Sequence, residues 1–223
     1  MLFLHFLFFL GIGHYIYKQV LSKLNRPNIL LTSEPHAQSI YTSWGYKPSQ
    51  HRACTFQGKL KTMENLTEQT NIEIHVQPMT DIFEKTITYE KSVSKEDRTG
   101  IFQMILNSPL LVTAQTATVN GEVKGFIVIL RDINNAMKTS AFQAETYEIA
   151  QVLLTKVAKF HVPEDKLFTA RFSGANFNEC AKLYSMFGLE DKKDEYQGMY
   201  YGKDSNVMWG SAYSLLNYAI SFV

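Results

Sequence analysis

The sequence has little of what would assign it to a specialised class of protein. Only two of its 223 residues are cysteine, and neither has a Cys-x-x-Cys partner or an adjacent histidine, which excludes a disulfide framework and a zinc motif. Its 22 lysines and arginines against 21 aspartates and glutamates leave a formal net charge of +1, so no global field attracts nucleic acid or an anionic membrane. We therefore expect structural thiols, no bound metal and no nucleic-acid partner.

Long hydrophobic runs are also missing. The longest one, Met1 to Leu10, falls short of the roughly 20 residues that a membrane helix needs, and His5 interrupts it. No basic residue precedes the run and no small-residue cleavage pattern follows it, so we interpret it as a buried central strand of a cytoplasmic protein. A secretory signal is the alternative interpretation, in which case Asn65 stands in a glycosylation pattern.

What the sequence does contain is an internal repeat. Residues 40–46 (IYTSWGY) correspond position for position to residues 183–189 (LYSMFGL). In both copies a helix, a β-rich run and a second helix occur in the same order, and the glycine near the end favours the left-handed conformation that closes a helix. The predicted segments are helices at 14–24 and 147–160, strands at 28–32 and 166–172, and helices from Pro35 and at 178–187.

The segment between the two copies adds strands and one helix. Asn120-Gly121 is the favoured two-residue hairpin turn, and apolar runs flank it on both sides. The predicted elements are strands at 72–76, 110–119 and 123–130 and a helix at 97–106. This pattern predicts an α+β fold with a mixed central β-sheet flanked by helices and built from two related units. We expect a first unit at 1–58, a polar linker at 59–71 and a second unit at 72–223.

The second copy of the repeat resembles the closing motif of the GNAT N-acetyltransferase superfamily. The resemblance rests on Ala181, Leu183-Tyr184 and Gly188-Leu189, and over Tyr89 to Gly202 it extends to GNAT proteins with two domains in tandem. It adds Tyr89-Glu90, Asp97-Arg98, the hairpin at 119–128 and the closing strand at 199–202. No residues before Met1 supply the opening strands of such a domain, so we expect the first unit to be the C-terminal half of a truncated first domain, either as a fragment or as a degenerate half-domain that completes its sheet in another way.

The resemblance also implies candidate site residues. In GNAT enzymes the equivalent tyrosine is often the acid that reprotonates the thiolate, which makes Tyr41 and Tyr184 the catalytic candidates; for Tyr184, packing of its helix on the sheet is the alternative. A glycine loop at a helix start holds the pyrophosphate of acetyl-CoA, and Gly11 and Gly13 match it. The loop expected in the second copy, 141–146 (AFQAET), has no glycine and places Glu145 at the helix start, where a carboxylate repels phosphate.

Two classes of function follow from these residues. The first is an acyltransferase that moves an acetyl group from acetyl-CoA to the amine of a small molecule or peptide. The second is a non-catalytic GNAT-like binding or regulatory module. The sequence identifies neither the acceptor, the general base nor the oligomeric state, because the histidines are scattered and fold resemblance does not determine activity.

Overall fold

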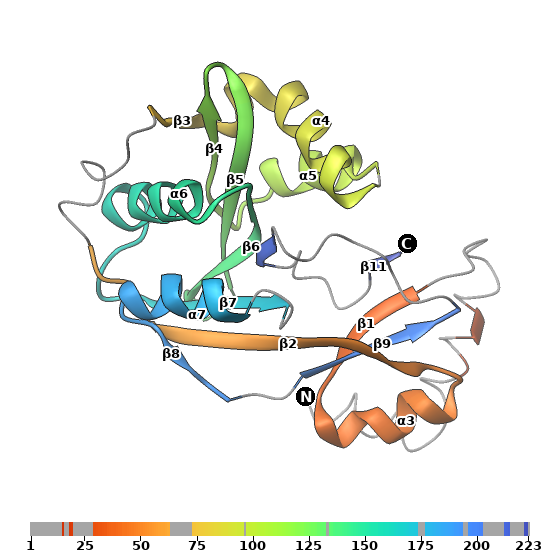
Figure 1. The fold of residues 1–223 in the computed structure, drawn as a ribbon. Helices are drawn as coiled ribbons and strands as arrows, with labels where there is room; N and C mark the ends of the chain where they lie inside the picture. The colour runs from red at the N-terminus through yellow and green to blue at the C-terminus, as the bar shows by residue number, and fades with distance from the viewer. Residues whose placement is uncertain are drawn as a thin grey trace.

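The computed structural model describes most of the chain from residue 29 onward (Figure 1). The described residues are 15, 18–19, 29–62, 73–95, 97–132, 134–173, 177–193, 196–202, 212–214 and 221–222. The predicted strand at 1–10 and the glycines at 11 and 13 lie outside them, as does most of the helix predicted at 14–24, of which residues 15, 18 and 19 are helical. None of the helices in the described ranges is long and apolar enough to cross a membrane.

The first unit consists of a strand, a short helix and a long strand. β1 (Ile29–Ser33) ends just before Pro35, whose fixed φ suits a first helical turn and which opens the 3₁₀ helix η1 (Pro35–Ala37). α3 (Gln38–Ser43) follows, and the chain then enters β2 (Lys47–Lys59). The strand and helix predicted here are confirmed.

The second unit opens with two helices and a hairpin. β3 (His75–Pro78), the 3₁₀ helix η3 (Met79–Ile82), α4 (Phe83–Ser94) and α5 (Thr99–Leu106) precede β4 (Leu111–Val119) and β5 (Glu122–Arg131). Asn120 and Gly121 have φ angles of 50° and 78°, the positive values that the predicted tight turn requires. The hairpin is therefore confirmed.

The rest of the second unit alternates strands and helices. Its elements are β6 (Met137–Ala144), α6 (Tyr147–Phe160), β7 (Leu167–Ser173), α7 (Phe177–Met186), β8 (Glu190–Asp191), β9 (Tyr196–Tyr201), β10 (Ala212–Ser214) and β11 (Ser221–Phe222). Thr146 begins α6 as a cap, because its hydroxyl accepts a hydrogen bond from the Ile149 N–H at 3.4 Å.

The described strands form one mixed sheet in the order β11, β1, β9, β2, β7, β6, β5, β4, β3, with β10 beside β6 and β8 beside β2. β6 and β7 run parallel, as two strands joined by a crossover helix do, and the other neighbours are antiparallel. The predicted α+β class with a mixed sheet flanked by helices is thus confirmed.

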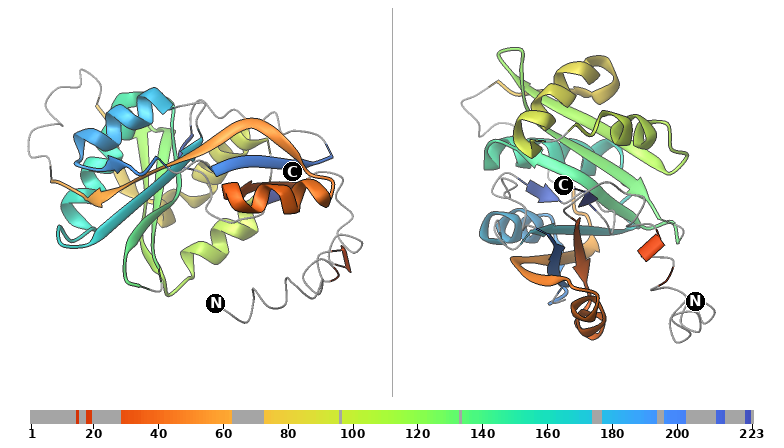
Figure 2. Two further views of the ribbon diagram at one scale, coloured as in Figure 1. Left: turned by 90° about the horizontal axis from the view of Figure 1, so that it is seen from below. Right: turned by 90° about the vertical axis from the view of Figure 1, so that its right-hand side faces the viewer.

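The two units exchange strands within this sheet. β2 follows α3 in sequence, yet it pairs with β7 of the second unit from Ala53↔Ser173 to Lys59↔Leu167. Conversely, β9 follows α7 and pairs with β1 of the first unit from Ile29↔Tyr201 to Ser33↔Gln197. Figure 2 shows α3 beside β2 and β9, the strands that cross between the units.

Two apolar clusters lie on opposite faces of the second unit's sheet. Beneath α6 and α7 the cluster includes Leu153, Phe168 and Phe172, each with 0% of its surface exposed. Beneath α4 and α5 it includes Phe102 and Phe126, also 0% exposed. Figure 1 shows these two pairs of helices on the two sides of the strands.

Several local predictions were wrong. Residues 59–61 do not begin a polar linker, because Lys59 ends β2, Leu60 is 2% exposed and the Lys61 N–H donates to the Phe187 carbonyl at 2.9 Å. The strand predicted from residue 72 starts at His75. Glu190 and Asp191, to which no element was assigned from the sequence, form β8, which pairs with β2. α4 was not predicted, and residues 141–144 belong to β6 rather than to a loop.

Candidate active site

The ends of α3 and α7 have the same hydrogen-bonded geometry. Gly45 and Gly188 follow them with φ angles of 92° and 82°, the left-handed conformation that closes a helix. Three backbone hydrogen bonds of 3.0–3.3 Å recur in both places. At α3 the N–H groups of Trp44, Gly45 and Tyr46 donate to the carbonyl oxygens of Ile40, Thr42 and Tyr41, respectively. At α7 the N–H groups of Phe187, Gly188 and Leu189 donate in the same way to those of Leu183, Ser185 and Tyr184. The sequence repeat is therefore a structural repeat, and Tyr41 and Tyr184 hold equivalent positions in it.

Tyr184 lies inside the apolar core. Its side chain is 0% exposed, and its ring stacks on that of Phe172 with the centroids 5.5 Å apart and the planes at 26°. Phe56 of β2 lies 6.1 Å away on the same side, so a strand from the first unit helps to enclose the ring. This placement favours the packing role over contact with a ligand.

Tyr41 is half-buried, and its surroundings are aromatic. Its ring meets those of Trp44 and Tyr46 edge to face, at centroid distances of 5.6 and 5.7 Å. Tyr46 in turn lies 5.8 Å from Tyr201 of β9, the strand that the second unit contributes. Burial raises the pKa of Tyr41 above its ordinary value, so its hydroxyl stays protonated at neutral pH.

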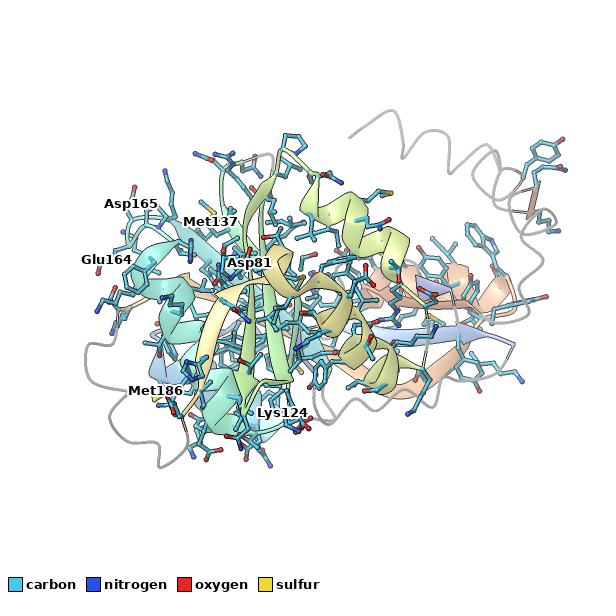
Figure 3. The ribbon with its side chains drawn as sticks, turned by 90° about the horizontal axis from the view of Figure 1, so that it is seen from above. Asp81, Lys124, Met137, Glu164, Asp165 and Met186 are labelled. Carbon is cyan, nitrogen blue, oxygen red and sulfur yellow. The ribbon has the colours of Figure 1, made fainter. Side chains whose placement is uncertain are left out.

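The start of α6 is acidic. Lys124 Nζ lies 3.2 Å from a Glu145 carboxylate oxygen and 3.3 Å from one of Glu122, and the hydrogen bond to Glu145 contributes most to raising the lysine pKa. The Glu148 pKa is lowered, first by a hydrogen bond from its own backbone N–H and then by one from Thr146. Figure 3 shows Lys124 at the end of the sheet opposite Met137. The carboxylates of Glu145 and Glu148 lie at the start of α6, where they repel phosphate, so these residues do not fit the pyrophosphate of acetyl-CoA.

β6 carries a bulge and buried polar groups close to this helix. Val128 of β5 pairs with Ala141 and Ile129 pairs with Thr139, which leaves Ser140 as the extra residue. Ser140 Oγ and Gln143 Oε1 have no hydrogen-bond partner within the described ranges, although the side chains are 0% and 8% exposed. Neither residue was predicted as part of a site, because part of this strand was assigned to a loop. Residues 139–144 (TSAFQA) show no regular alternation of polar and apolar residues that would have indicated a strand.

The remaining candidates form no further catalytic cluster within the described residues. Two histidines contact glutamates at the surface, His36 with Glu34 at 3.4 Å and His75 with Glu73 at 3.2 Å, and burial lowers the pKa of His161. No group of three or more potential metal ligands occurs in the part of the chain that the structure describes. Gly11 and Gly13 lie outside that part, so their role in binding acetyl-CoA stays a prediction.

This sheet order, with a parallel pair at its centre and helices on both faces, defines the class of the fold. The chain has the fold of GNAT acetyltransferases, as similarity to solved structures shows. A candidate acetyltransferase from Pyrococcus horikoshii matches 94% of this chain at 15% identity with a TM-score of 0.69. A GCN5-related N-acetyltransferase from Kribbella flavida matches 85% at 16% identity with a TM-score of 0.53. The tandem GNAT protein from the clavulanic acid biosynthesis pathway matches 88% at 12% identity with a TM-score of 0.56.

The extent of these matches limits what they establish. The chain spans 66% of the Pyrococcus protein, 47% of the Kribbella protein and 71% of the tandem GNAT protein. Comparison of the sequence with protein-family models and with curated proteins finds no significant match. The structural matches confirm the predicted GNAT resemblance as a fold, and a shared fold does not by itself determine activity.

Proposed function

We propose that the chain is a GNAT-type protein that transfers an acetyl group from acetyl-CoA to an amine on its first unit, while its second unit is non-catalytic. The contrast between two equivalent tyrosines carries this proposal. Tyr41 is half-buried at the end of α3, whereas Tyr184 is enclosed by aromatic rings in the core. A group that gives a proton to a leaving group must contact it, and of the two tyrosines Tyr41 is the one with exposed surface.

The proposed reaction is a direct attack. The amine nitrogen adds to the thioester carbonyl carbon, the C–S bond breaks, and the Tyr41 hydroxyl donates its proton to the sulfur of CoA. The proton that the amine loses passes to solvent, solvent returns a proton to the Tyr41 phenolate, and the backbone N–H groups of Gly11 and Gly13 would bind the pyrophosphate. Because burial raises its pKa, the Tyr41 hydroxyl is in the protonated form that a proton donor requires. The acceptor is the amine of a small molecule or a peptide.

A titration with acetyl-CoA tests the cofactor part of this proposal. Binding at about 100 times the dissociation constant should stabilise the chain by roughly 2.7 kcal/mol, which a thermal shift and the heat of binding both detect. Gly13→Glu should abolish the shift, because a side chain and a negative charge would enter the phosphate loop. Gly100→Glu is the matched control, since a Cβ added at Gly100 meets no atom within 4 Å. Equal thermal shifts in the unmodified chain, Gly13→Glu and Gly100→Glu would show that the loop of Gly11 and Gly13 does not bind acetyl-CoA.

Two tyrosine variants test the catalytic part. Tyr41→Phe should lower the rate of acetyl transfer to a panel of amines by about 10²-fold or more, because general acid catalysis contributes that much. Tyr184→Phe keeps the ring that packs on Phe172 and should leave the rate nearly unchanged. If Tyr184→Phe lowers the rate and Tyr41→Phe does not, the general acid is Tyr184 of the second unit and the proposal is wrong.

A non-catalytic binding module is the second candidate, and the acidic start of α6 favours it for the second unit. Glu145 occupies the end of the helix where phosphate would have to bind. If millimolar acetyl-CoA shifts neither the melting temperature nor the heat signal of the unmodified chain, this candidate applies to the whole protein.

A further inference from the structure

The parallel strands β6 and β7 are neighbours over only a short stretch. Their register consists of Met137↔Phe168 and Lys138↔Thr169, although β6 continues to Ala144 and β7 to Ser173. Beyond the paired residues the two strands diverge, so the peptide groups on their facing edges are not paired with each other. The region is buried, and buried backbone N–H and C=O groups need hydrogen-bond partners.

A segment from the C-terminal part of the chain lies in this gap. β10 pairs antiparallel with β6 through Ala212↔Gln143 and Ser214↔Phe142, and it also contacts β7. Figure 1 shows β10 beside β6. Adjacent strands lie about 4.8 Å apart, so two strands that admit a third between them must separate by about 10 Å. The divergence of β6 and β7 provides the width for one extended chain.

β6 also offers side-chain groups at this position. Gln143 and Ser140 are at least nine-tenths buried, and Gln143 Oε1 and Ser140 Oγ have no hydrogen-bond partner among the residues described. Polar atoms buried without a partner are costly unless a ligand or water satisfies them.

We propose that the gap between β6 and β7 is a binding site for an extended polypeptide strand and that its ligand is the chain's own segment around Ala212–Ser214. This rests on the proposed non-catalytic role of the second unit and specifies what that unit binds. Pairing with a strand edge gives affinity through the backbone, which needs no charge on the ligand. The acidic start of α6 is therefore compatible with a peptide strand but not with a phosphate.

Hydrogen exchange tests occupancy of the site in the full chain. The double substitution Ala212→Pro and Ser214→Pro removes two backbone N–H groups and disfavours strand pairing. Exchange at the Phe142 amide should then speed up by about tenfold or more, because it loses a neighbouring strand, whereas the Gln143 amide faces β5 and should not change. Asn206→Pro, outside β10, is the control and should leave both amides unchanged. Unchanged exchange at the Phe142 amide in the double variant would overturn the proposal.

A peptide added in trans tests the ligand class. The probe is a fluorescently labelled peptide of residues 207–217 (VMWGSAYSLLN). It should bind the double-proline chain at least about tenfold more tightly than the unmodified chain, whose own segment competes at high effective concentration. The same peptide with prolines at positions 212 and 214 should not bind. Equal binding to both chains, or binding of the proline peptide, would contradict the proposal.

One further titration separates failure of this site from failure of the proposed function. Acetyl-CoA is added to the double-proline chain that also carries Gly13→Glu, so that the first unit's loop is blocked. Absence of a thermal shift supports both proposals. A shift that the labelled peptide suppresses would overturn the non-catalytic second unit while the strand-binding site stands.

Discussion

Replacing Tyr184 by alanine removes a ring that lies wholly inside the protein. The side chain is 0% exposed and packs against Phe172 and Phe56, which come from different units of the chain. Its equivalent in the repeat, Tyr41, is half-buried. The same substitution at the two positions therefore compares a core residue with a site residue in one local backbone geometry.

The expected cost follows from the area buried. A buried aromatic side chain removes about 150 to 250 Å² from water, which at about 25 cal/mol per Å² corresponds to about 4 to 6 kcal/mol. Substitutions of core aromatic residues by alanine usually cost about 3 to 5 kcal/mol. We expect Tyr184→Ala to lower the free energy of unfolding by about 4 kcal/mol and Tyr41→Ala, which loses about half the area, by about 2 kcal/mol.

Urea unfolding followed by far-UV circular dichroism measures both values, with an unchanged slope as evidence that only stability has changed. A Tyr184→Ala cost below about 1 kcal/mol, or one smaller than that of Tyr41→Ala, would refute the reasoning. In that case the Tyr184 ring would not be packed in the core, and Tyr184 would again be a candidate for contact with a ligand.

Further predictions concern stability. Gly188→Ala should cost about 1 to 2 kcal/mol in thermal unfolding, because its φ of 82° is left-handed. Arg98→Met should lower the free energy of unfolding in urea by on the order of 3 kcal/mol, because it leaves the buried Glu90 carboxylate without the guanidinium that lies 3.4 Å away. Adding Glu90→Gln to that variant should recover part of the lost stability, because the buried charge is then removed. Hydrogen bonds from the Thr99 hydroxyl and N–H lower the pKa of Asp97 in the folded protein. The ionised Asp97 carboxylate therefore stabilises the fold above its unfolded pKa of about 3.9, and this contribution is lost as the pH falls through the folded pKa. Asp97→Asn should flatten the pH dependence of unfolding below about pH 4, and an unchanged slope would contradict this.

The repeat was predictable because its signal is local. A tyrosine and a glycine at fixed spacing define a helix end, and such short-range geometry depends on the residues of that turn alone. The hairpin at Asn120-Gly121 was predictable for the same reason. The catalytic role of Tyr41 stays a prediction, since a local motif fixes a backbone position without fixing a chemical step.

The missed elements have sequences that oppose their structure. α4 contains Thr86, Ile87 and Thr88 in succession, and β-branched residues favour strands, so only tertiary packing identifies the helix. β6 was also missed in part, because its polar residues and alanines have a low strand propensity. It is a strand because it pairs with β5 and is buried. Local propensity is a weak guide wherever a segment is enclosed by the rest of the fold.

The strand exchange could not be predicted from the sequence, because it depends on long-range pairing within one sheet. β2 and β9 follow the same motif in the two copies, and each could pair with the strand of its own copy or of the other. The structure has the second arrangement, so Phe56 from the first unit packs against Tyr184 and Tyr201 from the second packs against Tyr46. Phe56, which precedes the predicted boundary at 59–71, therefore lies in the same core cluster as Tyr184. Phe56 of the first unit therefore belongs to the packing around Tyr184, and Tyr201 of the second unit is linked to Tyr41 through the ring of Tyr46.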